Sequence, residues 1–331
     1  MSTAFQYRTN DTYFIGKNQD VIYNKAFLFS NQRGITKSAL VLPPEVAASW
    51  VSLYGSITVS QVGKEFPNGG MNEAGLVVEQ TTLLETEYPS ITGLPTVNEL
   101  QWIQYMLDTC QSVQEVLKAA HTISIGQNTS KLHYLIADRN GNCAIVEFIN
   151  GTILVHHEEL KYPLITNSPY KMACQEIEAG IIAWRDQAEY EQNSMLRFLT
   201  VVNRLKSSGN FENSIPWGFE VLSAARREDT VFSLVYDQSC LQIHMATSLD
   251  SNRRSISFTD FDFTNNTRAQ ATDLQGLCST GENVKFEEYT TDFNYQAVHS
   301  FFRDPLLTSY FQWKITDEMI HYLAHYPESF G

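Results

Sequence analysis

The chain begins Met1-Ser2-Thr3-Ala4-Phe5, and this stretch gains meaning once removal of its first residue is considered. Without Met1, Ser2 would carry both a hydroxyl nucleophile and a free α-amine. Such an amine titrates near pH ~8, close enough to neutrality for it to act as a general base. One residue would then supply the attacking oxygen and the base that activates it. Taken alone, a small residue at position two only permits removal of Met1, so the interpretation depends on the rest of the chain.

Three later segments support a functional interpretation of Ser2: residues 16–20 (GKNQD), residues 70–76 (GMNEAGL) and residues 166–169 (TNSP). Each segment is modest evidence by itself. Asn167 alone would fit a turn residue before Pro169, because Asn-Ser-Pro is common turn chemistry. It is the order and spacing of all four segments that makes the signal specific.

The pattern along the chain predicts an α+β fold. Residues 2–8 and 13–17 read as two strands joined by the turn pair Asn10-Asp11. Two helices are expected after residues 76–84, one beginning at Thr96 and one at Ser112, because each is followed three residues later by glutamate in a capping box. Further strands are expected at residues 39–42, 50–59, 132–137, 144–148, 152–156, 231–236, 241–245 and 256–258, and further helices within residues 172–206, 217–225 and 316–326. Within residues 172–206, an apolar stripe is expected along Leu196, Leu199 and Val202. No repeat or linker divides the chain, so a single domain over residues 1–331 is expected, with a C-terminal tail from about residue 290.

Composition excludes several classes of protein. A net charge of -14 with 23 Lys and Arg argues against a nucleic-acid surface, which needs clustered basic residues. The five cysteines are widely spaced and contain no CxxC, so neither a zinc site nor a disulfide framework is indicated. No apolar run reaches the ~20 residues of a membrane span. The segment His156-His157-Glu158-Glu159 lacks metal-ligand spacing, and Gly69-Gly70 lacks the context of a phosphate-binding loop, so the residues indicate neither a metal nor a phosphate-bearing cofactor.

These segments resemble the choloylglycine hydrolase and penicillin V acylase family of N-terminal-nucleophile hydrolases. The resemblance runs from Ser2 to about Asp237, is most specific at residues 70–79, and also includes residues 132–141 and 165–169. It implies a four-layer αββα sandwich with Ser2 at the end of a central strand. It also implies hydrolysis of linear non-peptide C–N amide bonds, with a small N-acyl amide as substrate.

The resemblance also assigns roles to individual residues. The nucleophile of the family falls on Ser2, the aspartate that holds its amine on Asp20, and the oxyanion-binding asparagine on Asn167. A second oxyanion position falls near Thr82, whose backbone N–H could serve. Arg197, followed by Phe198, matches an Arg-Phe pair that supports the nucleophile electrostatically, and Lys17 stands where the family has a second arginine.

Three departures from the family pattern leave the activity open. The family nucleophile is cysteine, and a hydroxyl is far less ionised than a thiol near neutral pH. Ser2 could therefore be a working serine nucleophile or an inactivating replacement. Lys17 offers a point charge in place of a planar guanidinium. Thr82 replaces the asparagine of bile-salt hydrolases and the tyrosine of penicillin V acylases, so bile salts, penicillin V, N-acyl homoserine lactones and other N-acyl amines all remain candidate substrates.

Two alternative functions follow from these departures. One is a catalytically silent homologue that binds acylated ligands. The other is a protein that retains Met1 and uses the hydrolase frame for an interaction. The stretch between Asn167 and Arg197 is shorter than in tetrameric bile-salt hydrolases, so their assembly loop is expected to be missing and a homo-oligomer is left open. As written the chain carries no signal peptide, which fits a cytoplasmic protein or an exported one whose leader has been removed.

Overall fold

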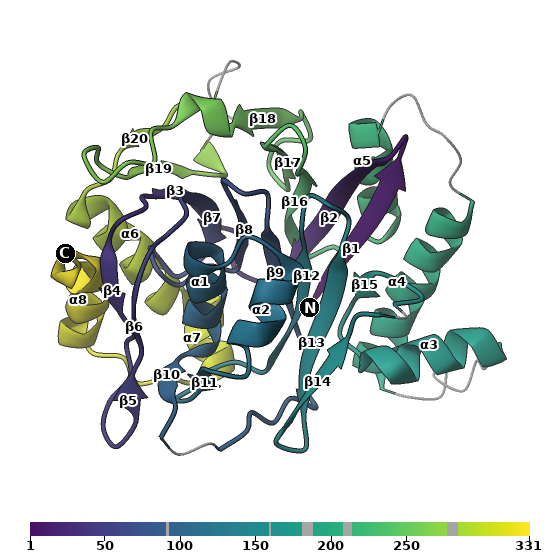
Figure 1. The fold of residues 1–331 in the computed structure, drawn as a ribbon, viewed down its shortest axis with the longest axis horizontal. Coiled ribbons are helices and arrows are strands. Elements are labelled where there is room, and N and C mark those ends of the chain that lie inside the picture. Colours follow the sequence, from purple (N-terminus) through teal and green to yellow (C-terminus); the bar gives the residue numbers. More distant parts are fainter. Residues whose placement is uncertain (91–92, 159, 181–187, 208–213, 277–283) are drawn as a thin grey trace.

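A computed structural model describes residues 1–90, 93–158, 160–180, 188–207, 214–276 and 284–331 of the chain (Figure 1). Its central feature is the hairpin of β1 (Ser2–Thr9) and β2 (Thr12–Asp20). The two turn residues, Asn10 and Asp11, both adopt positive φ, as a two-residue type I′ turn requires. This turn sets a register in which Ser2 pairs with Gln19. The expected hairpin is confirmed, and its register places the first strand residue beside the last residues of β2.

Two large sheets form the middle of the molecule. The smaller, which we call the first sheet, has the order β15-β1-β2-β16-β17-β18; its other strands are β15 (Leu164–Ile165), β16 (Thr230–Asp237), β17 (Gln242–Thr247) and β18 (Arg254–Ser257). The second sheet has the order β14-β13-β12-β9-β8-β7-β3-β19-β20; its strands are β3 (Phe27–Asn31), β7 (Ser56–Ser60), β8 (Gly69–Asn72), β9 (Val77–Thr82), β12 (Leu132–Ala137), β13 (Cys143–Ile149), β14 (Thr152–His156), β19 (Gln270–Asp273) and β20 (Glu287–Glu288). All the strand pairs of both sheets are antiparallel.

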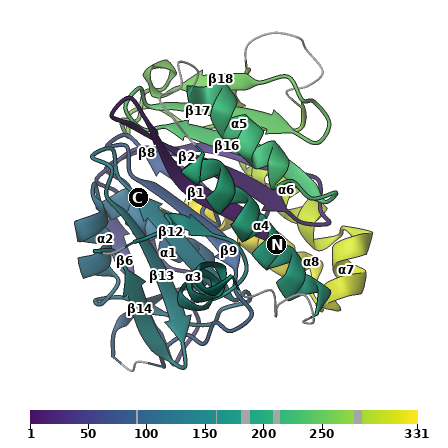
Figure 2. The same ribbon diagram turned by 90° about the vertical axis from the view of Figure 1, so that its right-hand side faces the viewer.

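Helices cover the outer faces of both sheets, which gives four layers (Figures 1 and 2). The first sheet is covered by α3 (Tyr170–Ala179), α4 (Glu189–Lys206) and α5 (Ser214–Ala224). The second is covered by α1 (Glu99–Thr109), α2 (Val113–Ala119) and α6 (Thr291–Phe302). Two short helices, α7 (Pro305–Phe311) and α8 (Asp317–His325), follow α6. Two small sheets, built from β4 (Thr36–Ser38), β5 (Val46–Ala47), β6 (Ser49–Val51), β10 (Pro95–Val97) and β11 (Ser124–Ile125), complete the described elements together with two 3-10 turns, Phe258–Asp260 and Tyr326–Ser329.

The apolar core lies on both sides of the second sheet. One cluster fills the space between the two sheets and continues under α3, α4 and α5; another joins the second sheet to α1 and α2. Gly16 marks a close approach within the first cluster. A Cβ at this position would come within 2.5 Å of the ring of Phe5, so glycine is required for that ring to cross the hairpin. The tight packing fixes the end of β2 on which Asp20 lies.

The GMNEAGL motif has a structural explanation. Asn72, at the end of β8, accepts hydrogen bonds from the N–H groups of Ala74 and Leu76 through Oδ1. Its Nδ2 donates to the carbonyls of Leu107 and Cys110, at the end of α1. Gly75, at φ +83°, allows the turn between these contacts. The motif therefore ties the second sheet to its helical layer.

Several sequence-based boundaries were wrong for identifiable reasons. The strand expected at residues 39–42 is displaced to β4, and the run at residues 50–59 is interrupted between β6 and β7. The first helix is capped by Asn98 in place of Thr96, because the Asn98 side chain accepts from two helical N–H groups while Thr96 belongs to β10. In α4 the buried side includes Arg197 and Phe198, and Leu196 from the expected apolar stripe is exposed.

Residues from about 290 onward form α6, α7 and α8. Ala297 of α6 packs on Phe27 and Phe29 of β3 and on Ala271 of β19. At the end of the chain, Gly331 exchanges backbone hydrogen bonds with Thr36. This part of the chain is therefore joined to the second sheet by apolar contacts and to β4 of the small two-stranded sheet by backbone hydrogen bonds.

Candidate active site

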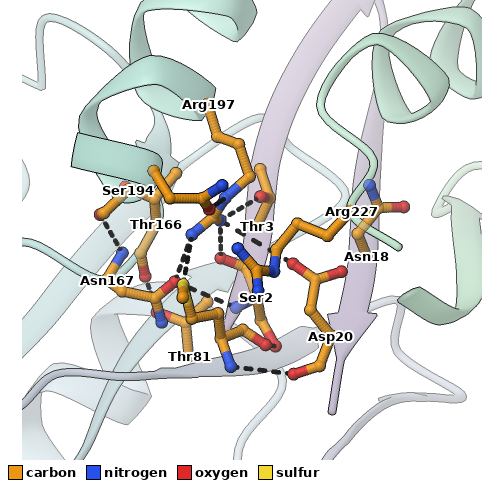
Figure 3. A network of polar contacts seen from close by, with 12 residues as sticks. Ser2, Thr3, Asn18, Asp20, Thr81, Thr166, Asn167, Ser194, Arg197 and Arg227 are labelled. Atoms are coloured by element: carbon orange, nitrogen blue, oxygen red, sulfur yellow. Dashed lines mark hydrogen bonds and ion pairs between the residues drawn. The ribbon is translucent and has the colours of Figure 1, made fainter. Parts of the chain in front are cut away.

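The site is built around Ser2, the first residue of β1, whose side chain is buried (Figure 3). Its hydroxyl donates to the carbonyl oxygen of Met1 and lies 3.3 Å from Oε1 of Gln19, its partner across the hairpin. Its backbone N–H donates to Oδ1 of Asn167 over 3.1 Å. With Met1 in place, the nitrogen of Ser2 is a peptide amide, so the nucleophile candidate is positioned but its amine is not yet free.

The α-amine of this chain belongs to Met1 and is held by the end of β2. It donates to the carbonyl oxygen of Asp20 over 2.8 Å. Burial lowers the pKa of this amine from 8.0 to about 6, although the nearby Asp20 carboxylate acts in the opposite direction and raises it. An amine in this setting is neutral over most of the physiological pH range, as a general base must be.

Asp20 lies with its carboxylate buried beneath α4. Oδ1 accepts a hydrogen bond from the Thr230 hydroxyl over 2.7 Å, and Oδ2 lies 3.9 Å from Nη1 of Arg197. Oδ2 has no hydrogen-bond partner within the described parts of the chain. A buried carboxylate oxygen without a donor carries a desolvation cost, and it remains able to accept a hydrogen bond from a cationic or amine group nearby.

Arg197 reaches from α4 across the end of β1. Nη1 donates to the carbonyl oxygen of Ser2 over 2.6 Å and to the hydroxyl of Thr3 over 2.8 Å. Nη2 donates to Oδ1 of Asn167 over 2.6 Å and lies 3.4 Å from Sδ of Met1. Burial lowers the pKa of Arg197 to about 10, which still leaves the guanidinium charged near neutrality. A fixed positive charge therefore lies against the backbone of the candidate nucleophile.

Asn167 lies two residues beyond β15 and uses both ends of its amide. Oδ1 receives the Ser2 N–H and the Arg197 guanidinium, while Nδ2 donates to the carbonyl of Thr82 over 2.7 Å. The backbone N–H of Asn167 donates to Oγ of Ser194 on α4. An amide NH₂ group has two hydrogens, so one remains for an additional acceptor such as a developing oxyanion.

The structure thus gathers Ser2, Asp20, Asn167, Arg197 and Thr82 at one end of the first sheet. Lys17 is placed differently. Its ammonium lies 3.3 Å from Oε2 of Glu79 and donates to the carbonyl of Gln80, both on β9 between the sheets. Burial lowers the pKa of Lys17 and raises that of Glu79, and each charge opposes the shift of the other. The described hydrogen bond and ion pair of the Lys17 ammonium are with β9 of the second sheet and not with Ser2.

The contacts around the buried Glu79 carboxylate were not predicted from the sequence. The Tyr236 hydroxyl donates to Oε1 of Glu79 over 2.5 Å, and a Cβ on Gly69 would come within 2.4 Å of its carboxylate. Glycine at this position therefore makes room for a buried acid. The sequence does offer one signal for the pairing. Lys17 and Glu79 each stand in a strand whose other residues are mostly buried, and two opposite charges in buried strands are expected to pair.

A second group of polar residues, which sequence analysis missed, lies beneath Asn167. The carbonyl of Thr166 accepts from the Thr81 hydroxyl and lies 3.1 Å from Nε2 of the buried His133. Nδ1 of His133 lies 3.1 Å from Oε1 of Glu147, and Oε2 of Glu147 lies 3.0 Å from Nε2 of His156. Burial acts to raise the pKa of Glu147, but hydrogen bonds from both histidines and from the backbone outweigh it and lower the pKa to about 2. His133 itself lies in β12 and is fully buried.

In the part of the chain that the structure describes, no group of three or more His, Cys, Asp or Glu side chains is arranged to hold a metal ion. Glu159, the last residue of the His-His-Glu-Glu segment, lies outside the described residues. Within the same limits, none of the helices has the length and apolar character needed to cross a bilayer. Cys110, Cys143, Cys174 and Cys240 are free thiols, and Cys278 is not among the described residues.

Comparison with known proteins agrees with this architecture. Residues 10–181, just over half of the chain, match the model of the linear amide C–N hydrolases of the choloylglycine hydrolase family. A penicillin V acylase of Pectobacterium atrosepticum is 30% identical over 141 residues. That match spans 38% of this chain and 37% of the length of the relative.

Two solved structures resemble the whole fold. A penicillin V acylase from Agrobacterium tumefaciens has a TM-score of 0.67 at 21% identity, covering 87% of this chain and 98% of that one. A mutant conjugated bile acid hydrolase from Clostridium perfringens has a TM-score of 0.64 at 14% identity, covering 88% and 97%. At these identities the likeness establishes the fold. The αββα sandwich of the N-terminal-nucleophile hydrolases, expected from the sequence, is confirmed.

Proposed function

The chain belongs to the choloylglycine hydrolase family of linear amide C–N hydrolases, and from that premise we propose that it hydrolyses the C–N bond of a small N-acyl amide with Ser2 as its N-terminal nucleophile. The observation that carries the proposal is the contact between Ser2 and Asn167. The group that would become the free amine already donates to Oδ1 of Asn167 over 3.1 Å, and the adjacent hydroxyl is buried beside it.

The proposed reaction starts once Met1 is absent. The Ser2 hydroxyl oxygen attacks the substrate carbonyl carbon, and its proton passes to the α-amine of the same residue. The resulting oxyanion accepts a hydrogen bond from the second Nδ2 hydrogen of Asn167. The C–N bond then breaks, and the proton moves from the α-amine to the departing amine. An ester between the acyl group and Ser2 remains.

The second half of the reaction uses the same groups. The α-amine takes a proton from water as the water oxygen attacks the ester carbonyl. Collapse of the second tetrahedral intermediate breaks the bond to Oγ of Ser2, which recovers its proton from the amine. The overall balance is one amide and one water giving one carboxylic acid and one amine. No other co-reactant is needed.

The neighbouring residues have supporting roles in this proposal. We assign Asp20 the role of accepting a hydrogen bond from the protonated amine, and the support for this is that Oδ2 has no hydrogen-bond partner among the described residues. Arg197 fixes the Ser2 carbonyl and the Asn167 side chain, and its positive charge opposes protonation of the amine. Thr82 contributes its carbonyl, which orients the Asn167 amide. For Lys17 we propose a structural role, because its described partners belong to the second sheet.

The test begins with an intact-mass measurement to establish whether Met1 has been removed. Amine release is then measured with conjugated bile salts, penicillin V and N-acyl homoserine lactones of several chain lengths. Turnover of any of these amides supports the proposal and identifies the acyl group. Saturable binding without turnover, by protein that has lost Met1, would instead favour a silent homologue that holds acylated ligands.

A further inference from the structure

A cavity of about 160 Å³ with a mixed polar and apolar lining lies on the outer side of the first sheet, between the end of α5 and the loop joining β17 to β18. Its volume is several times the ~30 Å³ that a water molecule takes up in the liquid, so it can hold a small molecule but not a large cofactor. Hydroxyl groups and two arginines dominate its polar lining, while Phe219, Phe232 and Ala246 form the apolar part. The polar lining residues are Ser223, Arg226, Thr230, Ser233, Thr247, Ser248, Ser251 and Arg253.

The charged side chains that line this cavity are both positive. Neither aspartate nor glutamate is among its lining residues. The two neighbouring arginines are neutralised, since Arg227 pairs with Asp229 and Arg254 with Asp250. Arg226 and Arg253 take part in no ion pair with any described residue, and Arg253 is held 5.0 Å above the ring of Phe219. In a chain with a net charge of -14, two unneutralised arginines at one polar cavity are a local exception that favours an anion.

We propose that this cavity binds a small tetrahedral oxyanion, phosphate or sulfate in type, between the guanidinium groups of Arg226 and Arg253. Guanidinium forks and hydroxyl donors are the groups that proteins use for such anions. The donors here are the two arginines and the serine hydroxyls of the loops, because the Thr230 and Ser233 hydroxyls already donate to residues of β2. The carbonyl end of α5, where Ser223 lies, opposes an anion. Arg226, two residues beyond the end of that helix, supplies the charge that offsets this effect.

The position of the cavity connects it to the candidate active site. Thr230 lines the cavity and donates to Oδ1 of Asp20 over 2.7 Å. Ser233 also lines the cavity and donates to Oδ1 of Asn18 over 2.7 Å. Asn18 lies two residues before Asp20 on β2. A bound anion would add negative charge close to the N-terminal amine and so favour its protonated form. This second part rests on the proposed function, because it concerns the amine that would act as the base.

Binding is tested by isothermal titration calorimetry with sodium sulfate, inorganic phosphate and phenyl phosphate, at constant ionic strength in a buffer without oxyanions. We expect one site per chain. The dissociation constant should rise about tenfold or more in each of R226Q and R253Q, because each substitution removes a charged hydrogen-bond donor. R226K and R253K should retain part of the affinity. The matched control is R204Q, which removes an exposed arginine of α4 away from the cavity and should bind as the parent does.

The titrations distinguish a free anion from an esterified one as the ligand of the cavity. Equal binding of phenyl phosphate and inorganic phosphate means that the site takes an esterified anion, whereas binding of the inorganic ions alone means that it takes a free one. Absence of a saturable site, or equal loss in R204Q, overturns the proposal. These measurements need no turnover, so they stand whether or not the amidase proposal does. If amide hydrolysis is found, saturating sulfate should move the acidic limb of its rate profile to higher pH; an unchanged limb with proven binding overturns the link to Asp20.

Discussion

Nη2 of Arg197 donates to Oδ1 of Asn167 over 2.6 Å, and the same oxygen accepts the backbone N–H of Ser2. This contact joins α4, the loop after β15 and the start of β1 at a single atom. The amide of Asn167 is thereby oriented, with its oxygen toward the nitrogen of Ser2 and its NH₂ group toward Thr82. An oriented donor costs no reorganisation when charge develops during a reaction.

Replacing Asn167 by alanine should lower kcat for amide hydrolysis by about 10²–10³-fold, the usual effect of removing one oxyanion donor. KM should change less, because the donor acts mainly in the transition state. Steady-state kinetics on the best amide checks this. The control is Asn203→Ala, an exposed asparagine on α4. Equal kcat in Asn167→Ala and the parent would remove Asn167 from the reaction.

The pH dependence of the reaction should follow the α-amine, which must be neutral to accept a proton. Activity is then present above the amine pKa and is lost as the pH falls through it. The Asp20 carboxylate raises the pKa of the Met1 amine, and we expect the same direction for the Ser2 amine once Met1 is absent. Asp20→Asn should therefore move the acidic limb of kcat/KM to lower pH. Rate profiles of Asp20→Asn and of the exposed turn variant Asp11→Asn provide the comparison. A limb that stays in place or moves to higher pH contradicts the assigned interaction.

Lys17 should matter for stability more than for chemistry. Lys17→Met leaves the buried Glu79 without its cationic partner, which typically costs about 3–5 kcal/mol of unfolding free energy. The double variant Lys17→Met/Glu79→Met should recover much of that loss. Urea unfolding measures both. The surface pair Lys161–Glu178 is the control, where Lys161→Met should leave the unfolding free energy nearly unchanged because both charges are exposed to water.

A different result would restore Lys17 to the reaction. If Lys17→Met folds with parental stability and loses its kcat selectively, then Lys17 acts on the nucleophile or substrate. The family resemblance suggested that role, and the described contacts of Lys17 do not include Ser2.

Glu147 should contribute stability that depends on pH. Its folded-state pKa of about 2 lies below the ordinary 4.5, so the stabilisation is complete above pH 4.5 and is lost as the pH falls toward 2. The shift corresponds to about 3 kcal/mol near neutrality, as an order of magnitude. Glu147→Gln should therefore lose stability at pH 7 and differ less from the parent at pH 3. Exposed Glu158→Gln is the control, and an equal deficit at both pH values would exclude the ionised carboxylate as the cause.

The sequence was sufficient for the fold and for the residues at the end of β1. Asn10-Asp11 predicts the turn that fixes the β1–β2 register, and this register alone carries Ser2 to the end of β2. The residues that meet there come from the β1–β2 hairpin, β9, the loop after β15 and α4. It is the resemblance to a family that predicts a common site for these residues. The local pattern does not predict this site. The apolar stripe expected on α4 leaves Arg197 off the buried face, whereas the structure buries Arg197.

Other features depended on contacts that a linear pattern does not encode. Lys17 lies near Ser2 in the sequence, but its ammonium points to Glu79 on the opposite sheet. The polar group of Thr81, His133 and Glu147 is spread over three strands whose letters read simply as buried β-structure. The strongest motif, around Asn72, proved to hold α1 against β8 and not to enter the site.

The most direct test of the account compares amine release by three forms of the protein that have lost Met1: the parent, Ser2→Cys and Ser2→Ala. We predict that Ser2→Cys turns over at least one linear amide faster than the parent, because a thiolate is the better nucleophile at the same position, and that Ser2→Ala turns over none. Turnover by Ser2→Ala at the rate of the parent would contradict the account. So would failure of the folded Ser2→Cys form on every amide tested.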